Sequence, residues 1–246
     1  MDKMIYVAMT GAKQTMNQQA AVSNNLANAN TSGFRAELAS FRAVPVVGPA
    51  QATRTFVTDS TPGANLAPGV IQQTGRALDV AVQGSGWIAV NGPDGKEGYT
   101  RDGNLQVDKN GALTTRHGDP VLGDNGPITV PLGSTDVTVT ADGTVSATQP
   151  GTPPATTAVG RIKLVDPAVR ALSRSNDGLF RTADGKPVQS DANVRLAPGA
   201  LEGSNVNLTE QMVNMISLAR QYDLNTKMIS TAGDNDKAAS SLLSLN

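Results

Sequence analysis

The stretch Asn24–Arg35, NNLANANTSGFR, decides how the chain is divided, because a helical pattern ends within it. It is rich in Asn, Thr and Ser, whose side chains compete with a helix for backbone hydrogen-bond partners. Gly33 has access to backbone conformations that other residues avoid, and Phe34 beside it is an apolar anchor. The stretch therefore predicts a helix end and a structured turn, from which a connector leaves with Phe34 held in a pocket.

Both ends of the chain carry a helical pattern. Residues 2–30 contain no proline and a single glycine, Gly11. Small or apolar residues recur at alternating intervals of three and four, which is the spacing of a coiled-coil seam. At the N-terminal end the seam consists of Ile5, Ala8, Ala12, Thr15, Gln19, Val22 and Leu26; at the C-terminal end it consists of Leu208, Met212, Met215, Ala219, Tyr222, Thr226 and Ile229. We expect Ser204 or Asn205 to cap the second helix, with Glu210 in its first turn.

Both seams are weak. In the first, only Ile5, Val22 and Leu26 are large, and burying each contributes about 1.5–3 kcal/mol. Fixing the backbone costs about 1–2 kcal/mol per residue, so a lone helix of this kind is expected to fray in water. We therefore expect the two helices to need each other and further subunits as well. A helical pair packed within one monomer is the alternative.

Between the helices the pattern changes to short β signals. LDVAVQGSGWIAV alternates apolar and polar residues around a break at Gly84–Gly86, and Asn110–Gly111 is a strong hairpin turn signal. Further turns are expected at 124–126 and 142–143. The predicted fold class is α+β, with the two terminal helices paired as a coiled-coil-like core and a central antiparallel β domain. The expected divisions are a helix over 1–34, an extended connector over 35–75, the β domain over 76–200 and a helix over 201–246.

Composition excludes several classes of protein. The formal net charge is −1 and the basic residues are dispersed, so we expect no nucleic-acid partner. The chain has no cysteine, which removes disulfides, thiolate metal sites and thiol nucleophiles. No apolar run approaches the roughly 20 residues of a membrane span, and the N-terminus lacks the pattern of a cleaved signal peptide. We therefore expect no membrane insertion.

Motifs for catalysis are weak. His117 is the sole histidine, which argues against catalysis by a histidine pair and fits an exposed turn residue. DGNLQVDKNGAL has a faint resemblance to a calcium loop, but the central Gly and terminal Glu are missing, so a hairpin is the better interpretation. Trp87, Tyr99 and Phe180 lie in apolar strands and are expected in the core. We predict that the protein is not an enzyme and has no cofactor.

The junction motif Asn25-x-x-Asn28-x-x-Thr31-x-Gly33-Phe34-Arg35 matches the signature of the flagellar basal-body rod and hook family. TGRALDVAVQGSGWIAV and GYTRDGNLQVDKNGALTT resemble that family's central β domain, and the stretch from Leu201 to Ala232 resembles its C-terminal helix. The resemblance covers essentially the whole chain in the family's order. Within the family, MDKMIYVAMTGA and GFRAELASFRAVPV are most similar to proximal rod members of the F type. Ser32 stands where the family often has Pro, and Gly233 is expected to loosen the end of the last helix.

The resemblance implies a structural axial subunit of the proximal rod, which polymerises into the drive shaft that transmits torque for motility. Its implied partners are other proximal and distal rod subunits and the flagellar type III export apparatus, with location in the periplasm-spanning rod after export without a cleaved signal. The candidate assembly interface comprises Ile5, Ala8, Ala12, Val22, Leu26, Leu208, Met212, Met215, Ala219, Tyr222 and Ile229. Phe34 and Leu38 also resemble the Phe-x-x-x-hydrophobic element that export substrates present to the export gate.

Three alternatives remain open from the sequence. One is another axial protein of the same family, chiefly the distal rod protein. A second is a secreted β-domain module that binds cell-wall glycan, which would need exposed aromatic residues; the 3% aromatic content argues against it. A third is a wall-cutting enzyme with paired carboxylates, for which no pair of acids stands out.

Overall fold

The computed structural model describes residues 3–45, 55–151, 155–168 and 172–243, and the chain forms two compact units. A helical unit is drawn from Met1–Ala29, Glu37–Gly63 and Val206–Asn246, and a β unit is drawn from Asn30–Ala36 and Ala64–Asn205. The chain therefore passes from one unit to the other four times. None of the described helices is both long and apolar enough to cross a membrane.

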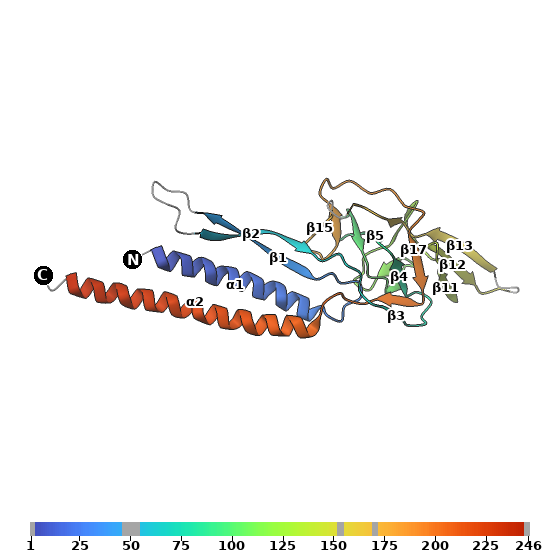
Figure 1. Cartoon of the computed structure of the whole chain (residues 1–246). Helices are drawn as coiled ribbons and strands as arrows, with labels where there is room; N and C mark the ends of the chain where they lie inside the picture. Colours follow the sequence, from blue (N-terminus) through green and yellow to red (C-terminus); the bar gives the residue numbers. More distant parts are fainter. Residues whose placement is uncertain (1–2, 46–54, 152–154, 169–171, 244–246) are drawn as a thin grey trace. The chain divides into compact units, whose positions relative to one another are not determined.

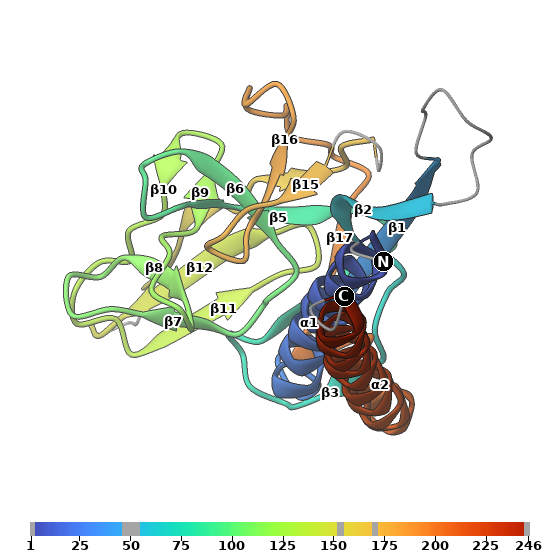
Figure 2. The same ribbon diagram turned by 90° about the vertical axis from the view of Figure 1, so that its left-hand side faces the viewer.

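The helical unit contains two long helices that lie side by side, α1 (Lys3–Ala27) and α2 (Leu208–Leu243) (Figures 1 and 2). Strand β1 (Glu37–Pro45) pairs with β2 (Thr55–Ala64) and also contacts α1. The paired terminal helices confirm the predicted arrangement at the level of helix against helix. The stretch expected to be an extended connector with edge strands contains two strands of nine and ten residues.

The predicted cap of the second helix was wrong. Its cap is Asn207, whose Oδ1 accepts a hydrogen bond from the Glu210 backbone N–H at 3.2 Å, rather than Ser204 or Asn205. The helix also continues without interruption through Gly233 to Leu243. A single glycine costs about 1 kcal/mol in a helix interior, so the expected loosening of the last turns by Gly233 stays a prediction.

The β unit is built from short antiparallel strands, as the turn spacing predicts. Five of them form one sheet in the order β14-β5-β6-β16-β15, and three more form a second sheet in the order β11-β12-β13. The other strands pair two by two: β17 with β4, β18 with β3, β7 with β8 and β10 with β9. The strands are β3 (Ile71–Gln73), β4 (Val80–Gln83), β5 (Trp87–Asn91), β6 (Glu97–Thr100), β7 (Leu105–Val107), β8 (Leu113–Thr115), β9 (Leu122–Gly123), β10 (Gly126–Pro127), β11 (Asp136–Val139), β12 (Thr144–Gln149), β13 (Ala155–Arg161), β14 (Leu164–Val165), β15 (Leu172–Arg174), β16 (Phe180–Thr182), β17 (Arg195–Pro198) and β18 (Ala200–Glu202).

The core of the β unit lies on both faces of strand β5, because successive side chains of a strand point to opposite faces. Ile88 and Val90 join a large aliphatic cluster, whereas Trp87 and Ala89 join a smaller one with Phe180. The Trp87 and Phe180 ring centroids are 4.7 Å apart. The buried positions of Trp87, Tyr99 and Phe180 confirm the prediction that these aromatic residues belong to the core.

Candidate functional site

The predicted junction motif is divided between the two units. Asn25 and Asn28 belong to the helical unit, and Thr31 to Arg35 belong to the β unit. The helix ends at Ala27, so the two amides lie at its last turn. The motif is therefore best described as two sets of contacts, one within each unit, on a single continuous stretch of chain.

Within the helical unit, Asn25 binds the start of strand β1. Its side chain is 3% exposed; its Oδ1 accepts from the Glu37 backbone N–H at 2.7 Å, and its Nδ2 donates to the Glu37 carbonyl at 2.9 Å. The same Nδ2 lies 3.5 Å from the Gln211 Oε1 on α2. Asn28 acts more locally, because its Nδ2 donates to the carbonyl and the side-chain oxygen of Asn24, both at 2.9 Å. Asn25 thus connects α1 to β1 and approaches α2, and Asn28 caps the helix end.

Within the β unit, Gly33 makes a close approach that only glycine allows. Its φ angle is 67°, and a Cβ atom at this position would lie 2.2 Å from the carbonyl carbon of Arg101. Its N–H donates to the Glu202 carbonyl at 2.8 Å, and the neighbouring Ser32 hydroxyl donates to the Asp102 carboxylate at 2.5 Å. The Phe34 ring is buried and lies 4.6 Å beneath the Arg174 guanidinium. Phe34 is buried, as expected, and its role as an anchor of the connector stays a prediction.

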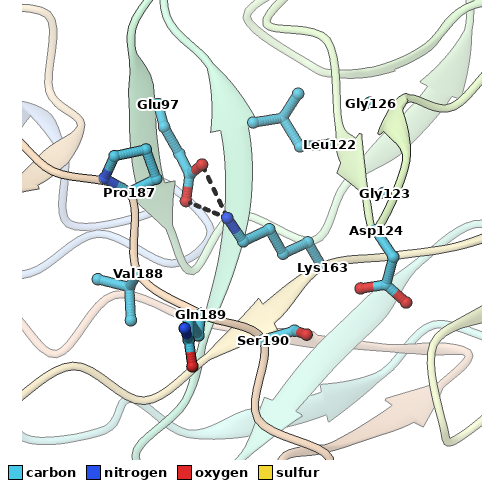
Figure 3. Close-up of a pocket in the computed structure, with 10 residues that line it drawn as sticks. All are labelled: Glu97, Leu122, Gly123, Asp124, Gly126, Lys163, Pro187, Val188, Gln189 and Ser190. Carbon is cyan, nitrogen blue, oxygen red and sulfur yellow. Dashed lines mark hydrogen bonds and ion pairs between the residues drawn. The ribbon is translucent and has the colours of Figure 1, made fainter.

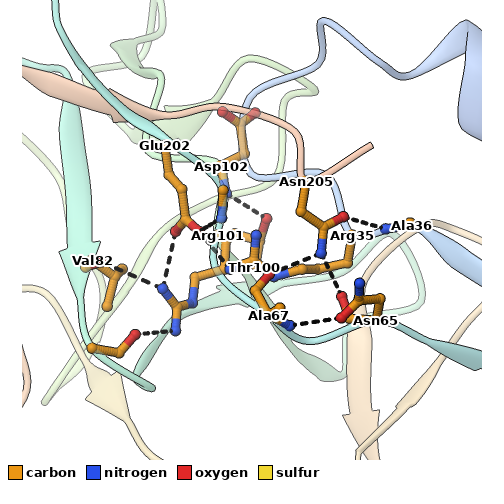
Figure 4. A network of polar contacts seen from close by, with 12 residues as sticks. Arg35, Ala36, Asn65, Ala67, Val82, Thr100, Arg101, Asp102, Glu202 and Asn205 are labelled. Carbon is orange, nitrogen blue, oxygen red and sulfur yellow. Dashed lines mark hydrogen bonds and ion pairs between the residues drawn. The ribbon is translucent and has the colours of Figure 1, made fainter. Parts of the chain in front are cut away.

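Arg35 enters a charged network that is almost closed to water (Figure 4). Its guanidinium lies 2.6 Å from the Glu202 Oε1, and the Arg101 Nη1 lies 3.0 Å from the Glu202 Oε2. The side chains of these three residues are at most 3% exposed. Both guanidinium groups also face Trp87, at 5.9 Å and 5.2 Å from its ring centre. One carboxylate therefore holds two cations in a dry environment.

Burial lowers the pKa of Arg101, and the charge of the Glu202 carboxylate opposes that shift. The Arg101 guanidinium also donates to the Gly84 carbonyl at 2.6 Å. In addition to the two arginines, Glu202 accepts a bond from the Gly69 backbone N–H at 2.8 Å. Glu202 thus joins the incoming stretch 33–35, strand β18 and the 67–70 segment, which are distant in sequence.

Asn205 is the second residue that gathers distant segments. Its Oδ1 accepts from the Ala36 N–H at 2.7 Å, and its Nδ2 donates to the carbonyls of Asn65 and Ala67 at 2.7 and 2.8 Å (Figure 4). Ala36, Asn65 and Asn205 are each within two residues of a point where the chain enters or leaves the β unit. The chain passes between the two units at four places. The side chain of Asn205 therefore bonds the β-unit residues next to two of these places and itself lies at a third.

The residues of the predicted assembly interface occupy different environments. Ala8 and Ala12 are buried in the helical unit, and Ile5, Val22, Leu26, Met215, Ala219, Tyr222 and Ile229 are half-buried. Leu208 and Met212 are exposed. No contact with another subunit is described, so the role of these residues in assembly stays a prediction.

A hollow of about 600 Å³ lies elsewhere in the β unit (Figure 3). Its centre is occupied by an ion pair, in which the Lys163 Nζ donates to both oxygens of Glu97 at 2.8 and 2.9 Å. The Tyr99 hydroxyl donates to Glu97 as well and accepts from the Val188 N–H. Burial raises the pKa of Tyr99 to about 12. Glu97 and Lys163 therefore bind each other, and Tyr99 connects Glu97 to the backbone of Val188.

The residues considered for catalysis or metal binding are arranged as structural residues. The stretch that resembles a calcium loop is a hairpin of β7 and β8, with the Asp108 Oδ1 accepting from the backbone of Asn110 and Ala112. His117 is exposed and lies 3.5 Å from the buried Asp102 carboxylate. Within the described ranges, no group of three His, Cys, Asp or Glu side chains is placed to hold a metal ion.

Comparison with known proteins identifies the same three regions that carry the resemblance. A model described as flagella basal body rod protein matches residues 5–35, the FlgE/F/G hook protein D1 domain matches 81–147, and the FlgEFG basal body rod protein C-terminal region matches 197–242. The flagellar basal-body rod proteins FlgF of Salmonella typhimurium and Escherichia coli are 52% and 50% identical to this chain over the full length of both proteins.

A basal-body rod protein FlgG from Buchnera aphidicola is 32% identical, with 93% of this chain and 95% of that protein covered. The 52% and 50% identity to two FlgF proteins over the full length of both chains supports the F type. These relatives are named as rod proteins of the flagellar basal body, and the contacts described above hold segments of the chain together. The chain therefore belongs to the flagellar basal-body rod protein family, as a structural subunit of the proximal rod.

Proposed function

We propose that the chain acts by polymerising through its helical unit, which packs against the helical units of neighbouring rod subunits to form a shaft that transmits torque. The observation that carries this proposal is the outer surface of α1 and α2. Ten large apolar side chains of these helices are between 37% and 63% exposed. They are Tyr6, Val7, Met9, Met16, Leu208, Met212, Val213, Ile216, Leu224 and Met228.

The positions on α2 show why a partner is needed. The side that faces α1 carries half-buried residues such as Met215, Tyr222 and Ile229. Met212, Ile216 and Leu224 are exposed on the remaining surface, so apolar residues surround much of the helix. A helix that is apolar on most sides is normally buried on most sides. Contiguous exposed apolar surface marks an interaction site, and unlike surfaces on successive subunits generate an open helical polymer.

The test replaces two outer residues, Ile216→Glu and Leu224→Glu, in one full-length variant. Because both side chains are exposed in the single chain, the subunit is expected to fold and to be stable as before, but not to enter basal bodies or support swimming. Leu132→Glu is the matched control, since Leu132 is an exposed leucine of the β unit. Normal rods built from the double variant would contradict the proposal.

We also propose that the junction motif sets the path of the chain between the helical core and the outer domain. The double contact of Asn25 with Glu37 supports this role, because two hydrogen bonds to one residue define direction as well as distance. Asn25→Ala is expected to leave the β unit folded and to reduce rod assembly, with Asn214→Ala at an exposed amide of α2 as the control. Equal swimming of the two variants would argue against this role.

The export apparatus is the other partner that we propose, with secretion that needs no cleaved signal. Phe34 of the candidate gate element is 7% exposed and Leu38 is 51% exposed. Because Phe34 is buried in the folded protein, both side chains are accessible to the export apparatus only when the chain is unfolded. Leu38→Ser is expected to lower secretion without changing the stability of the folded protein. Val70→Ser, at an apolar residue that is 72% exposed, is the control. Unchanged secretion of the Leu38 variant would remove Leu38 from the element.

A further inference from the structure

Three residues that disfavour helix meet at one level of the helical unit. The Thr15 hydroxyl is bonded to the Gly11 carbonyl at 2.9 Å and lies 3.3 Å from the Asn225 Nδ2 on α2. A Cβ atom on Gly11 would lie 3.2 Å from the Asn225 Oδ1, so the absence of a side chain makes room for the amide. Thr15 is 2% exposed. The three residues form one polar layer between otherwise small or apolar neighbours.

Each of these three residues has a low intrinsic preference for the helical conformation. Glycine is the poorest helix former after proline, and Thr and Asn also rank low. Such local conflicts in an otherwise consistent element are expected where a residue has a specific task. Because all three lie at the same level and touch one another, their shared task concerns the contact between α1 and α2.

The α1 side of the contact defines the alignment of the helices poorly. On α1 the buried residues near this layer are the small Ala8 and Ala12, whereas the half-buried residues of α2 within about one turn of Asn225 are Tyr222 and Ile229. Small side chains form shallow knobs, so the alanines of α1 alone do not select one alignment with the larger side chains of α2. A shift of seven residues, about 10 Å along the axis, returns the same face to the contact.

We propose that Gly11, Thr15 and Asn225 form a register lock, which selects one alignment of α1 and α2 and thereby determines the specificity of the assembly surface. Asn225 is half-buried, and an interfacial Asn that finds its partner in only one alignment is the best-attested device of this kind in paired helices. The consequence for assembly rests on the proposed function: a seven-residue shift moves the exposed Met9 and Met16 of α1 past Ile216 and Leu224 of α2.

A register lock and a contact that only stabilises the helix pair predict different results when Asn225 is replaced. Asn225→Leu removes a half-buried amide but leaves the Thr15 hydroxyl bonded to the Gly11 carbonyl, so that hydroxyl stays paired and the expected cost in stability is small. Asn225→Leu is therefore expected to retain or increase helix content while losing the unique alignment. Asn214→Leu is the matched control, because Asn214 is exposed on the same helix.

The alignment is measured by disulfide crosslinking of the purified full-length chain, whose lack of cysteine gives a clean background. Ala8→Cys with Ile229→Cys reports the observed register, since each lies one turn beyond the Gly11–Asn225 contact. Ala8→Cys with Tyr222→Cys reports the alignment shifted by seven residues. Both pairs are oxidised in the same thiol–disulfide buffer, and the ratio of shifted to observed crosslinking is compared among variants.

We expect Asn225→Leu to raise that ratio about fivefold or more, which corresponds to about 1 kcal/mol of lost preference for a hydrogen bond. Thr15→Val, which removes only the hydroxyl, is expected to act in the same direction. An unchanged ratio in both variants, equal to that of Asn214→Leu, would overturn the lock. The proposed function is tested separately, by whether the unaltered chain enters rods. If it did not, the proposed function would be contradicted, but the crosslinking would still report the alignment of the two helices.

Discussion

Replacing Glu202 with Gln tests the buried charge network most severely. Glu202 is 1% exposed and binds both Arg35 and Arg101, so Glu202→Gln leaves two buried guanidinium groups without a counter-charge while keeping the shape of the side chain. Removing one partner of a buried pair typically costs about 3–5 kcal/mol. For a domain of this size, each kcal/mol lowers the melting temperature by about 2–4 °C, so the expected fall is about 6–20 °C.

The assay uses the fluorescence of Trp87, which is the only tryptophan and lies against both guanidinium groups. Urea and thermal unfolding of the full-length variant are followed at this one residue. Asp94→Asn is the control, because Asp94 is 44% exposed and its partner Arg181 retains Asp177; a change within about 1 kcal/mol is expected there. If Glu202→Gln lost no more stability than Asp94→Asn, the reasoning about uncompensated buried charge would be refuted.

Three further predictions concern single positions. Gly33→Ala is expected to cost more than about 2 kcal/mol by urea unfolding, because the residue has a φ angle of 67° and its Cβ would meet the Arg101 backbone; a loss below about 1 kcal/mol would contradict the close approach. The pKa of Tyr99 is raised from 10.0 to about 12, so its neutral form contributes stability that is present below pH 10 and lost as the pH rises toward 12. Tyr99→Phe is expected to remove that alkaline loss, and absorbance titration of tyrosinate should find one late-titrating tyrosine; titration of all tyrosines together near pH 10 would disagree. Asn207→Ala is expected to lower helix stability by about 0.5–2 kcal/mol, measured by circular dichroism, because it removes the cap of α2. Asn205→Ala is not expected to lower helix stability in this way, because Asn205 is not the cap.

Periodic patterns in the sequence predicted the elements of this fold well. The three-and-four spacing from Ile5 to Leu26 and the turn signals at Asn110–Gly111 and Asp142–Gly143 rest on local preferences that the structure obeys. The cap of α2 was missed because several neighbouring residues, such as Ser204, Asn205 and Asn207, are chemically suitable. The tertiary contacts of Asn205 remove it from the cap.

The junction shows what a pattern does not contain. Gly33, Phe34 and Arg35 stood out in the sequence, but their partners Glu202 and Arg101 did not. A buried arginine requires a carboxylate, yet the chain has 21 acidic residues, and nothing in their spacing selects Glu202. Asn65 and Asn205 lie 140 residues apart in sequence, and the fold alone brings them together.

Amide hydrogen exchange, compared between the free full-length chain and purified basal bodies, tests most directly the claim that the helical unit completes its order by docking. We predict that α1 and α2 pair in the free chain but open often, so that residues 5–27 and 208–243 exchange faster there than in the rod, whereas the β unit is protected in both states. Equal and strong protection of both helices in the free chain would contradict the account, because the helical unit would then be complete without neighbouring subunits.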